Sequence, residues 1–544
     1  MDKIYYICKY SPLELIKGFD IDIEKPDMEV INFECADSCS HPNLCGFGKA
    51  ILENIIKQNI KNIILVDCCD VCRRLYDILS VSDKMDFVFL FNLPHKNDKD
   101  SLNILKEELI RLKKSIELHF HKKFDTQKAI KYLQEQTKEN TKIFEPHIEI
   151  NGAHCEETLL KIAKELSAFP IIDKTCNGSR ILAPFKTQED NFLEAYSYSL
   201  LNQQNSCVRM LFDNKQINEN TKGLICHTIK FCDYWGFHFK DINASLKIPI
   251  LKLETDYSSQ SQGQLSTRLS AFFEILNKKT KETKAISQDI FYVIGIDSGS
   301  TSTKGVILNN RKEIISSAII PTGTNAKSSA ENVLNLILEK ANLTESDIKN
   351  IVTTGYGRDT LNIKSNSITE ITCHAKGANY LFPKAKTVID IGGQDLKIIC
   401  INENGDVENF VMNDKCAAGT GRFLEMMSKI LELNLDEMSE KGLNGKNNVE
   451  ISSMCSVFAE SEVVSLIANN TPIEDIINGL NNAVALKLLS LINRTNAKPS
   501  FIMTGGVSKN KGIVNTLSKK LNNEIFVSEK SQLCGAIGAA IFAL

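Results

Sequence analysis

Two segments far apart in the chain place an aspartate where an apolar strand meets a glycine turn. They are VIGIDSGSTSTKGVIL (293–308) and TVIDIGGQDLKIIC (387–400), and their aspartates are Asp297 and Asp390. Apolar alternation interrupted by such a turn predicts a β-hairpin in each. Glycine lets backbone N–H groups approach an anion, hydroxyls add donors, and a carboxylate there can hold Mg²⁺ directly or through water. The two hairpins therefore predict a phosphate and magnesium site.

A third segment, FIMTGGVSKNKGI (501–513), repeats the order of strand, paired glycines and helix start. The chain has no G-x-x-x-x-G-K-[ST] motif, which excludes a P-loop. Together the three segments resemble the ATPase superfamily of actin and the sugar kinases. That resemblance implies ATP in a cleft between two ribonuclease-H-like lobes. The alternative interpretation is a set of ordinary buried hairpins with turn glycines.

The chain contains 17 cysteines, most of them in its first half. The first residues lack a signal-peptide pattern, and no apolar run of about 18 residues could span a bilayer. We therefore expect a cytoplasmic protein, in which thiols serve metal or redox chemistry more often than disulfides. The net charge of −3 gives no reason to expect nucleic acid or an anionic membrane as a partner.

Two cysteines of the second half, Cys416 and Cys455, each directly precede a strong helical pattern. A helix N-terminus lowers the pKa of a thiol and stabilises an anion, such as an iron–sulfur cubane. A cubane normally needs four thiolates, so two cysteines predict a symmetric dimer with one cluster on its two-fold axis. The alternative is a pair of buried cysteines that act as small apolar residues.

The elements that must position these groups fall into two halves. With 544 residues, 43% of them apolar, the chain is long enough for three or four folding units. Its first half alternates strands and helices, which predicts parallel α/β layers with sites beyond the carboxyl ends of the strands. A lysine-rich segment at 276–289 separates the halves. We place the domains at 1–278 and 291–544, joined by a linker at 279–290.

Residues from about 290 to 544 resemble the activator of 2-hydroxyacyl-CoA dehydratases, also called the benzoyl-CoA reductase-type ATPase family. The motifs that carry the resemblance are GIDSGSTSTKGV, TTGYGR, EITCHAKGA, DIGGQDLK, NDKCAAGTGRFLE, SSMCSVFAESEV and TGGV. The resemblance implies a homodimer with one 4Fe–4S cluster, held by Cys416 and Cys455 of each subunit. It also implies that ATP binding and hydrolysis push an electron onto a partner at very low potential.

The same resemblance assigns roles at the nucleotide by position. Asp297 and Asp390 surround Mg²⁺, and Gln394 orients the attacking water, which makes Asp297 and Gln394 the catalytic candidates. Phosphate contacts fall to Ser298, Gly299, Ser300, Thr301, Lys304, Gly392 and Gly393. Gly505 and Gly506 flank the adenosine. Lys304 could instead be a solvated strand-edge lysine, and His374 could either touch the nucleotide or be a satisfied core histidine.

The first half, to about residue 275, resembles a 2-hydroxyacyl-CoA dehydratase subunit. The motifs are SPLELIKGF, NLCGFGKAI, VDCCDVCRRLYDIL, DKTCNGSR, NSCVRM, GLICHTIKFCDYWG and IPILKLETDYSSQSQGQLSTRLSAFFEIL. Such subunits bind one cubane through three cysteines and leave one iron open, which maps to Cys45, Cys69 and Cys232.

The surplus of thiols departs from that pattern and is closer to relatives with a double-cubane cluster and about six protein thiolates. The further ligands would then be Cys68, Cys176 and Cys207, and Cys35, Cys39 or Cys72 could replace any of these three. A zinc site on Cys69 and Cys72 with Cys35 and Cys39 is the alternative. Inert buried thiols are expected at Cys8, Cys155 and Cys226.

The leading hypothesis is an ATP-driven reductase with its motor and acceptor in one chain, which raises the effective concentration of each for the other. Ferredoxin or flavodoxin would reduce the Cys416/Cys455 cluster, and ATP would drive that electron to the first half, where a small substrate is reduced. The rival is an activator fused to a dehydratase subunit that acts on acyl-CoA with a second subunit. A small-molecule kinase with a zinc module and a nucleotide-gated scaffold are the remaining alternatives.

Overall fold

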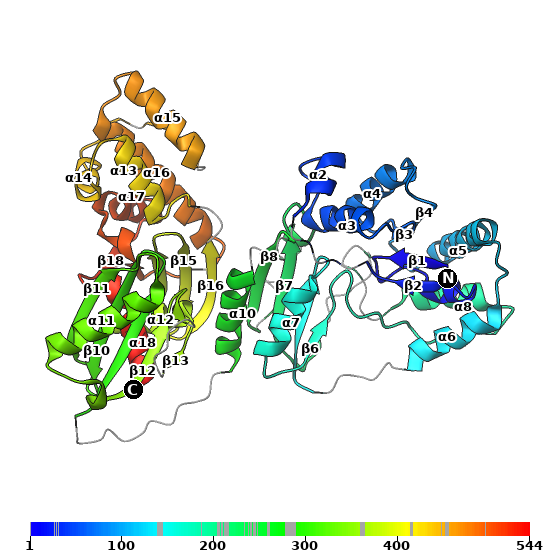
Figure 1. The fold of residues 1–544 in the computed structure, drawn as a ribbon, viewed down its shortest axis with the longest axis horizontal. Coiled ribbons are helices and arrows are strands. Elements are labelled where there is room, and N and C mark those ends of the chain that lie inside the picture. Colours follow the sequence, from blue (N-terminus) through cyan, green and yellow to red (C-terminus); the bar gives the residue numbers. More distant parts are fainter. Residues whose placement is uncertain are drawn as a thin grey trace. The chain divides into compact units, whose positions relative to one another are not determined.

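The chain folds into two compact units, Met1–Leu269 and Ser270–Leu544, and each is described here by itself (Figure 1). This computed structural model describes all residues except 1, 27, 29, 31, 139–144, 187, 204–206, 208–209, 211–216, 233, 238, 240–241, 243–245, 247, 258–261, 278–289, 359–364, 414–416, 448, 452–455 and 496. The division falls within helix α10 (Gln262–Leu276). The predicted linker at 279–290 lies outside the described residues, apart from Ile290.

The N-terminal unit contains two four-stranded sheets, and every strand pair in both is parallel. The first sheet has the order β2-β1-β3-β4, with β1 Lys3–Tyr6, β2 Asp22–Glu24, β3 Asn62–Val66 and β4 Phe87–Phe91. The second has the order β6-β5-β7-β8, with β5 His147–Gly152, β6 Ile171–Asp173, β7 Thr221–Ile229 and β8 Ile250–Thr255. This confirms the predicted parallel α/β layers.

Helices connect and cover these strands, as parallel crossovers require. They are α1 Leu13–Lys17, α2 Glu34–Cys39, α3 Gly46–Lys57, α4 Asp70–Ser80, α5 Lys99–Phe120, α6 Thr126–Lys138, α7 Glu157–Leu166 and α8 Phe192–Leu201. Strands β3 and β4 read as near-continuous apolar runs, NIILV and FVFLF, because a parallel sheet is buried on both faces.

The C-terminal unit contains two five-stranded sheets of matching topology. Their orders are β11-β10-β9-β12-β13 and β16-β15-β14-β17-β18. In each, three antiparallel strands come first and two further strands add in parallel. The bounds are β9 Tyr292–Ser298, β10 Ser302–Asn309, β11 Ile314–Pro321, β12 Ile348–Thr354, β13 Asn366–Ser367, β14 Thr387–Ile391, β15 Leu396–Ile401, β16 Val407–Asn413, β17 Phe501–Thr504 and β18 Ile525–Val527. The repeat confirms the predicted two-lobed fold.

Helices form the remaining layers of this unit. They are α11 Ala326–Ala341, α12 Glu370–Leu381, α13 Gly421–Ile430, α14 Leu435–Lys441, α15 Ser456–Ala468, α16 Ile473–Ile492, α17 Lys511–Leu521 and α18 Cys534–Ala543. Helices α11 and α18 pack on opposite faces of the first sheet. Helix α12 packs on one face of the second sheet, and α13, α16 and α17 pack on the other. None of the helices in the described part of the chain is both long and apolar enough to cross a membrane.

Helices α12 and α18 lie side by side between the two sheets, and glycines let their backbones touch. A Cβ on Gly538 would lie 1.7 Å from Cys373 O, and one on Gly377 would lie 2.0 Å from Cys534 O. A larger side chain at Gly377 or Gly538 would force α12 and α18 apart, and with them the sheets on which these helices pack. This contact fixes the first turn of α12, which carries polar residues of the nucleotide site.

We expect Gly538→Ala to lower the free energy of unfolding by about 3 kcal/mol, because the new methyl group would overlap a backbone carbonyl. Urea unfolding followed by circular dichroism measures this loss. Gly263→Ala is the control, since a Cβ on Gly263 meets nothing within 4 Å. Equal stability of the two variants would contradict the close contact of α12 with α18.

Candidate functional site

A cavity of about 440 Å³ lies between the two lobes of the C-terminal unit. The predicted residues that line it are Asp297, Gly299, Ser300, Thr301, Lys304, Asp390, Gly392, Gly393, Gly505 and Gly506. A Cβ on Gly393 would lie 2.1 Å from Thr301 Oγ1, so the two hairpin turns approach closely across the cavity. Gly505 has a φ of +82°, which L side chains rarely adopt. The three predicted turns thus converge on one site.

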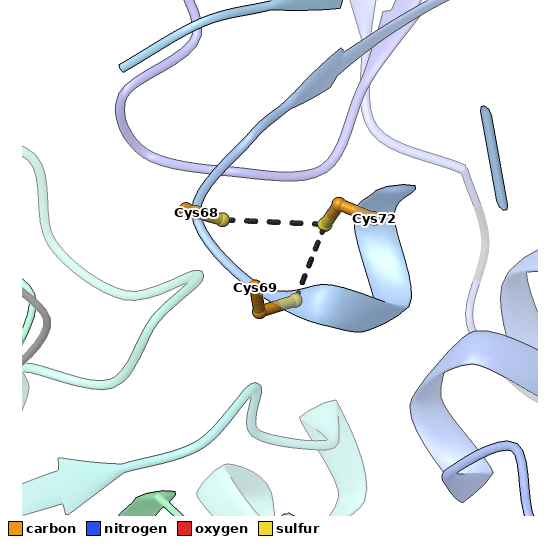
Figure 2. Close-up of side chains that lie close together, drawn as sticks. All are labelled: Cys68, Cys69 and Cys72. Carbon is orange, nitrogen blue, oxygen red and sulfur yellow. Dashed lines mark hydrogen bonds between the residues drawn. The ribbon is translucent and has the colours of Figure 1, made fainter. Parts of the chain in front are cut away.

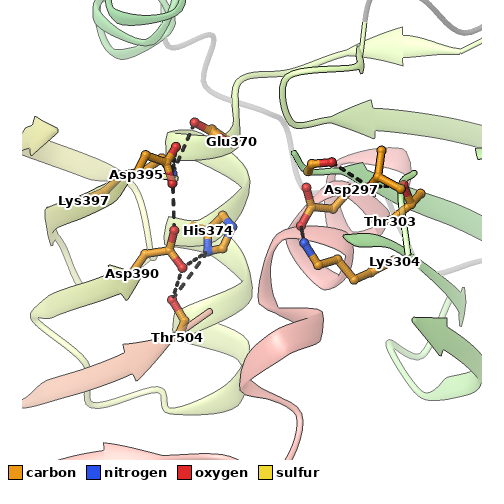
Figure 3. Close-up of polar contacts among 11 residues, drawn as sticks. Asp297, Thr303, Lys304, Glu370, His374, Asp390, Asp395, Lys397 and Thr504 are labelled. Atoms are coloured by element: carbon orange, nitrogen blue, oxygen red, sulfur yellow. Dashed lines mark hydrogen bonds and ion pairs between the residues drawn. The ribbon is translucent and has the colours of Figure 1, made fainter. Parts of the chain in front are cut away.

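The two hairpins carry the same charged pair in the same register. Strand β9 pairs with β10 so that Asp297 lies opposite Lys304, and β14 pairs with β15 so that Asp390 lies opposite Lys397. Lys304 Nζ is 3.1 Å from Asp297 Oδ2, and Lys397 Nζ is 3.4 Å from Asp390 Oδ2 (Figure 3). Sequence analysis missed Lys397, although both lysines stand seven positions after their aspartate. Lys304 lines the cavity, and its ammonium is ion-paired rather than solvated.

Lys397 is the more deeply buried of the two lysines, with 2% of its side chain exposed. Its Nζ also lies 2.8 Å from Asp395 Oδ2 and 3.3 Å from Glu370 Oε1. Burial alone would lower the pKa of Lys397, but Asp395, Glu370 and Asp390 together raise it well above its ordinary value. The site therefore contains a permanent internal cation held by three carboxylates.

Glu370 is the first residue of α12 and lines the same cavity. Burial raises the pKa of Glu370 to about 7, against the opposing effect of Lys397. Its Oε1 is buried, and its polar contact is the ion pair with Lys397 Nζ at 3.3 Å. Sequence analysis missed this residue, although it begins the EITCHAKGA motif. The arrangement gives the cavity a carboxyl group that can be protonated or ionised near neutral pH.

His374 lies one helical turn further along α12 and is almost completely buried. Its Nδ1 is 3.1 Å from Asp390 Oδ1, which also accepts a hydrogen bond from Thr504 Oγ1 at 2.8 Å. Burial would lower the pKa of His374, but Asp390 raises it well above its ordinary value. His374 is thus a satisfied buried histidine and also a lining residue of the cavity, which combines the two alternatives.

Two predicted nucleotide residues lie elsewhere. Ser298 is buried beneath its turn, close to Gly357, and does not line the cavity. Gln394 is exposed, although it stands between lining residues on either side. Its predicted role in orienting water therefore has no support from this arrangement.

A second cavity, of about 690 Å³, lies in the N-terminal unit and is lined by sulfur. Its cysteines are Cys8, Cys45, Cys68, Cys69, Cys176, Cys207 and Cys232. All six predicted ligands are among them. Most follow a parallel strand: Cys68 and Cys69 follow β3, Cys176 follows β6, and Cys232 follows β7. These strands belong to both parallel sheets of the unit, and the segments that follow their carboxyl ends line the same cavity, so side chains from distant segments converge there. We call this space the thiol cavity.

Two sulfur contacts join Cys72 to lining residues of the thiol cavity (Figure 2). Cys72 Sγ is 3.4 Å from Cys69 Sγ and 4.0 Å from Cys68 Sγ. Hydrogen bonds from Cys68 and Cys72 lower the pKa of Cys69 well below its ordinary value, even though the thiol is buried. The group thus stabilises one thiolate, the form in which cysteine binds metal. Cys176 Sγ and Cys207 Sγ form a second pair, 3.9 Å apart.

The remaining cysteines separate into those near the thiol cavity and those away from it. Cys8 was expected to be an inert buried thiol, but it lines the cavity because β1 ends beside β3. Cys35 and Cys39 lie on α2 and do not line it, so the structure does not bring together the four thiols of the zinc alternative.

Burial raises the pKa of Cys226 to about 12 and that of Cys155 well above its ordinary value, as expected of unreactive thiols. The predicted ligands Cys416 and Cys455 lie outside the described residues.

The donor set of the thiol cavity fits an iron–sulfur cluster. Seven sulfur atoms line one space, one of them favoured as a thiolate, and soft thiolates are the ligands that such clusters take. The described residues that line the nucleotide cavity include lysines and carboxylates but no cysteine. The two cavities therefore offer chemically different ligand atoms.

Comparison with known proteins assigns both halves. Residues 294–543 match the family model described as the BadF/BadG/BcrA/BcrD ATPase family. Residues 8–149 and 126–276 match that of the 2-hydroxyglutaryl-CoA dehydratase D-component.

Among individual proteins, the chain is 46% identical over 252 residues to a 2-hydroxyisocaproyl-CoA dehydratase activator of Clostridioides difficile, covering 46% of this chain and 94% of that protein. It is 44% identical over 252 residues to an activator of lactoyl-CoA dehydratase of Anaerotignum propionicum, covering 46% and 97%. The crystal structure of component A of the (R)-2-hydroxyglutaryl-CoA dehydratase of Acidaminococcus fermentans shares 43% identity with a TM-score of 0.45, over 46% of this chain and 97% of that one.

We expect Lys397→Met to lower the free energy of unfolding by about 3 kcal/mol, because it leaves buried carboxylates without their cation. Lys304→Met is the matched variant, since it removes the corresponding lysine but only one carboxylate contact. We expect it to cost about 1 kcal/mol. Urea unfolding without nucleotide measures both, and equal losses would contradict the central place of Lys397 among the carboxylates.

Proposed function

The chain belongs to the BadF/BadG/BcrA/BcrD ATPase family, and from that premise we propose that ATP hydrolysis in its C-terminal domain drives electrons onto an iron–sulfur cluster in its N-terminal domain. The observation that carries the proposal is the presence of a nucleotide cavity and a thiol cavity in one chain. The acceptor domain spans 1–278 and the motor domain 291–544. The reduced cluster then passes electrons to a small substrate.

The sulfur count of the thiol cavity supports a cluster larger than one cubane. A single cubane uses at most four cysteines. The cavity offers seven, and Cys72 lies in contact with two of them. We assign Cys45, Cys69 and Cys232 to one cubane, with Cys68, Cys176 and Cys207 as the further ligands of a double cubane. The surplus sulfur leaves these six assignments to be tested by substitution.

The motor cluster requires two copies of the chain. Cys416 and Cys455 give two thiolates per subunit, and a 4Fe–4S cluster takes four. Helix α15 begins directly after Cys455 and leaves apolar side chains exposed: Val457 at 65%, Phe458 at 64% and Val464 at 51%. An exposed apolar face of this kind is suited to a second copy of the same helix around a shared axis. We therefore propose a homodimer through the motor domain, reduced by ferredoxin or flavodoxin.

ATP hydrolysis would supply the free energy that electron transfer to a cluster of lower potential requires. A one-electron transfer becomes tenfold less favourable for about every 59 mV uphill, and cluster potentials extend to about −700 mV. Asp297 and Asp390 would hold Mg²⁺, directly or through water, at the phosphates of ATP.

Glu370 replaces Gln394 as the residue proposed to receive the attacking water, because Glu370 lines the cavity and Gln394 does not. The water oxygen bonds to the γ-phosphorus, the bond from that phosphorus to the β–γ bridging oxygen breaks, and the proton passes to the Glu370 carboxylate. Lys397, Asp395, His374 and Asp297 are the charged groups that act on Glu370.

The D-component match favours one alternative function, an activator fused to a dehydratase subunit. It would act on an acyl-CoA together with a second subunit. Co-purification of such a subunit and acyl-CoA-dependent turnover would favour this alternative over reduction of a small substrate by the chain alone.

We expect Glu370→Gln to reduce ATP hydrolysis at least 100-fold while leaving ATP binding intact, because the amide cannot take the proton. Phosphate release and calorimetric binding separate the two effects. In the unsubstituted protein, hydrolysis should rise with pH through about 7, where Glu370 becomes a carboxylate, and the variant should lose this step. Gln394→Ala is the matched control and should hydrolyse ATP normally. The reverse result would return the role to Gln394.

The electron relay is tested by Cys416→Ser in anaerobically purified protein. We expect it to abolish ATP-dependent reduction of the N-terminal cluster while sparing nucleotide binding, because the motor cluster loses a ligand.

Iron analysis of the unsubstituted chain should give about ten irons for a double cubane plus half a shared cubane, and about six for a single cubane plus that half. A chain with about two irons would lack the N-terminal cluster, and unchanged reduction in the variant would refute the relay.

A further inference from the structure

Lys9 is a buried lysine beside the thiol cavity, with 3% of its surface exposed. Its Nζ donates hydrogen bonds to two backbone carbonyls, Thr175 O at 3.0 Å and Lys174 O at 3.4 Å. Within the described part of the chain, no carboxylate lies within 4.0 Å of this ammonium group. Burying a charge without an opposite charge costs several kcal/mol. The arrangement is understandable if an anion that the polypeptide does not itself supply lies nearby.

Two neighbouring cations, Lys174 and Arg180, have acidic partners, in contrast to Lys9. Lys174 Nζ is 2.7 Å from Glu149 Oε1, and Arg180 Nη2 is 2.7 Å from Glu14 Oε2. In each of these pairs the two opposite charges balance each other. Lys9 is therefore a buried positive charge that no described carboxylate neutralises within 4.0 Å, whereas Lys25, which donates to Asn177 O, is exposed.

Lys9 is fixed against the wall of the thiol cavity on two sides. Its own neighbour in the chain, Cys8, lines the cavity. The two carbonyls that it binds belong to the residues directly before Cys176, which also lines the cavity. Lys9 is therefore held between two segments that each carry a cysteine of the wall.

We propose that Lys9 is the fixed countercharge of the cluster bound in the thiol cavity, and that it raises the reduction potential of that cluster. This inference rests on the proposed function. Reduction adds one negative charge to the cluster, and a nearby buried cation stabilises the reduced form more than the oxidised form. Net charge around a cluster is one of the factors that set its potential. Lys9 is in this sense a positioning residue, since it acts through the cluster and touches no substrate.

The test is a redox titration of the N-terminal cluster, monitored by electron paramagnetic resonance in the full chain. Lys9→Met removes the charge and keeps the length, whereas Lys9→Arg keeps the charge. At a fixed potential near the midpoint, we expect the ratio of reduced to oxidised cluster to fall about tenfold in Lys9→Met, a shift of about −59 mV. Lys9→Arg should stay close to the unsubstituted protein. Lys25→Met, which removes an exposed lysine that binds Asn177 O, should shift the potential less.

Each outcome decides the question. An unshifted potential in Lys9→Met with full iron content would overturn the inference. If Lys9→Met loses iron and Lys9→Arg keeps it, the charge is needed for the cluster to assemble, which supports the inference. Loss of iron from both variants would show that the fit of the lysine to its carbonyls matters instead, and would overturn it. Absence of iron from the cavity of the unsubstituted protein would reject the proposed function itself, and the inference with it.

Discussion

The charge balance of the nucleotide cavity depends on one repeated register, in which an aspartate lies opposite a lysine across a hairpin turn. Asp297 with Lys304 and Asp390 with Lys397 give each lobe its own ion pair at the same place in its sheet. The turns between the paired residues carry the glycines that face the cavity. Moving either strand by one residue would turn its charged side chain to the other face of the sheet, and the site would lose both its acid and its internal cation.

In the N-terminal unit, the parallel strand arrangement brings the cysteines of the thiol cavity together. Cysteines separated by more than 200 positions in sequence line one space because the strands before them end at neighbouring edges. The lining combines sulfur with a few exposed charged side chains, Asp70, Arg74 and Asp77, which form ion pairs with one another. The buried charge of Lys9 lies next in sequence to the lining residue Cys8, and a cation there favours a bound group that is itself anionic.

The sequence predicts those features of the fold that depend on a few neighbouring residues, such as the turns at the nucleotide cavity. A glycine turn between apolar strands is set by a few neighbouring residues, so the structure brings the three expected turns and most of their named residues to one cavity, while their roles at the nucleotide stay predictions. The convergence of six cysteines followed from the strand pattern. Glu370 and Lys397 were missed because their burial depends on how α12 packs against the second sheet and α18. Gln394 is exposed beside the cavity, because a turn residue can face either the cavity or solvent without any change in the motif, and its role stays a prediction. The position of Cys8 in the wall of the thiol cavity was not predicted, because it depends on the pairing of β1 with β3.

The internal lysines also affect how the nucleotide cavity meets a metal ion. Where Mg²⁺ takes up Asp297 or Asp390 directly, it must compete with an ammonium group for the same oxygen atoms. Such an exchange would release a lysine, for which the phosphate oxygens of a bound nucleotide would be new partners. Metal and nucleotide would therefore enter as cooperating ligands, each improving the affinity for the other by the same factor.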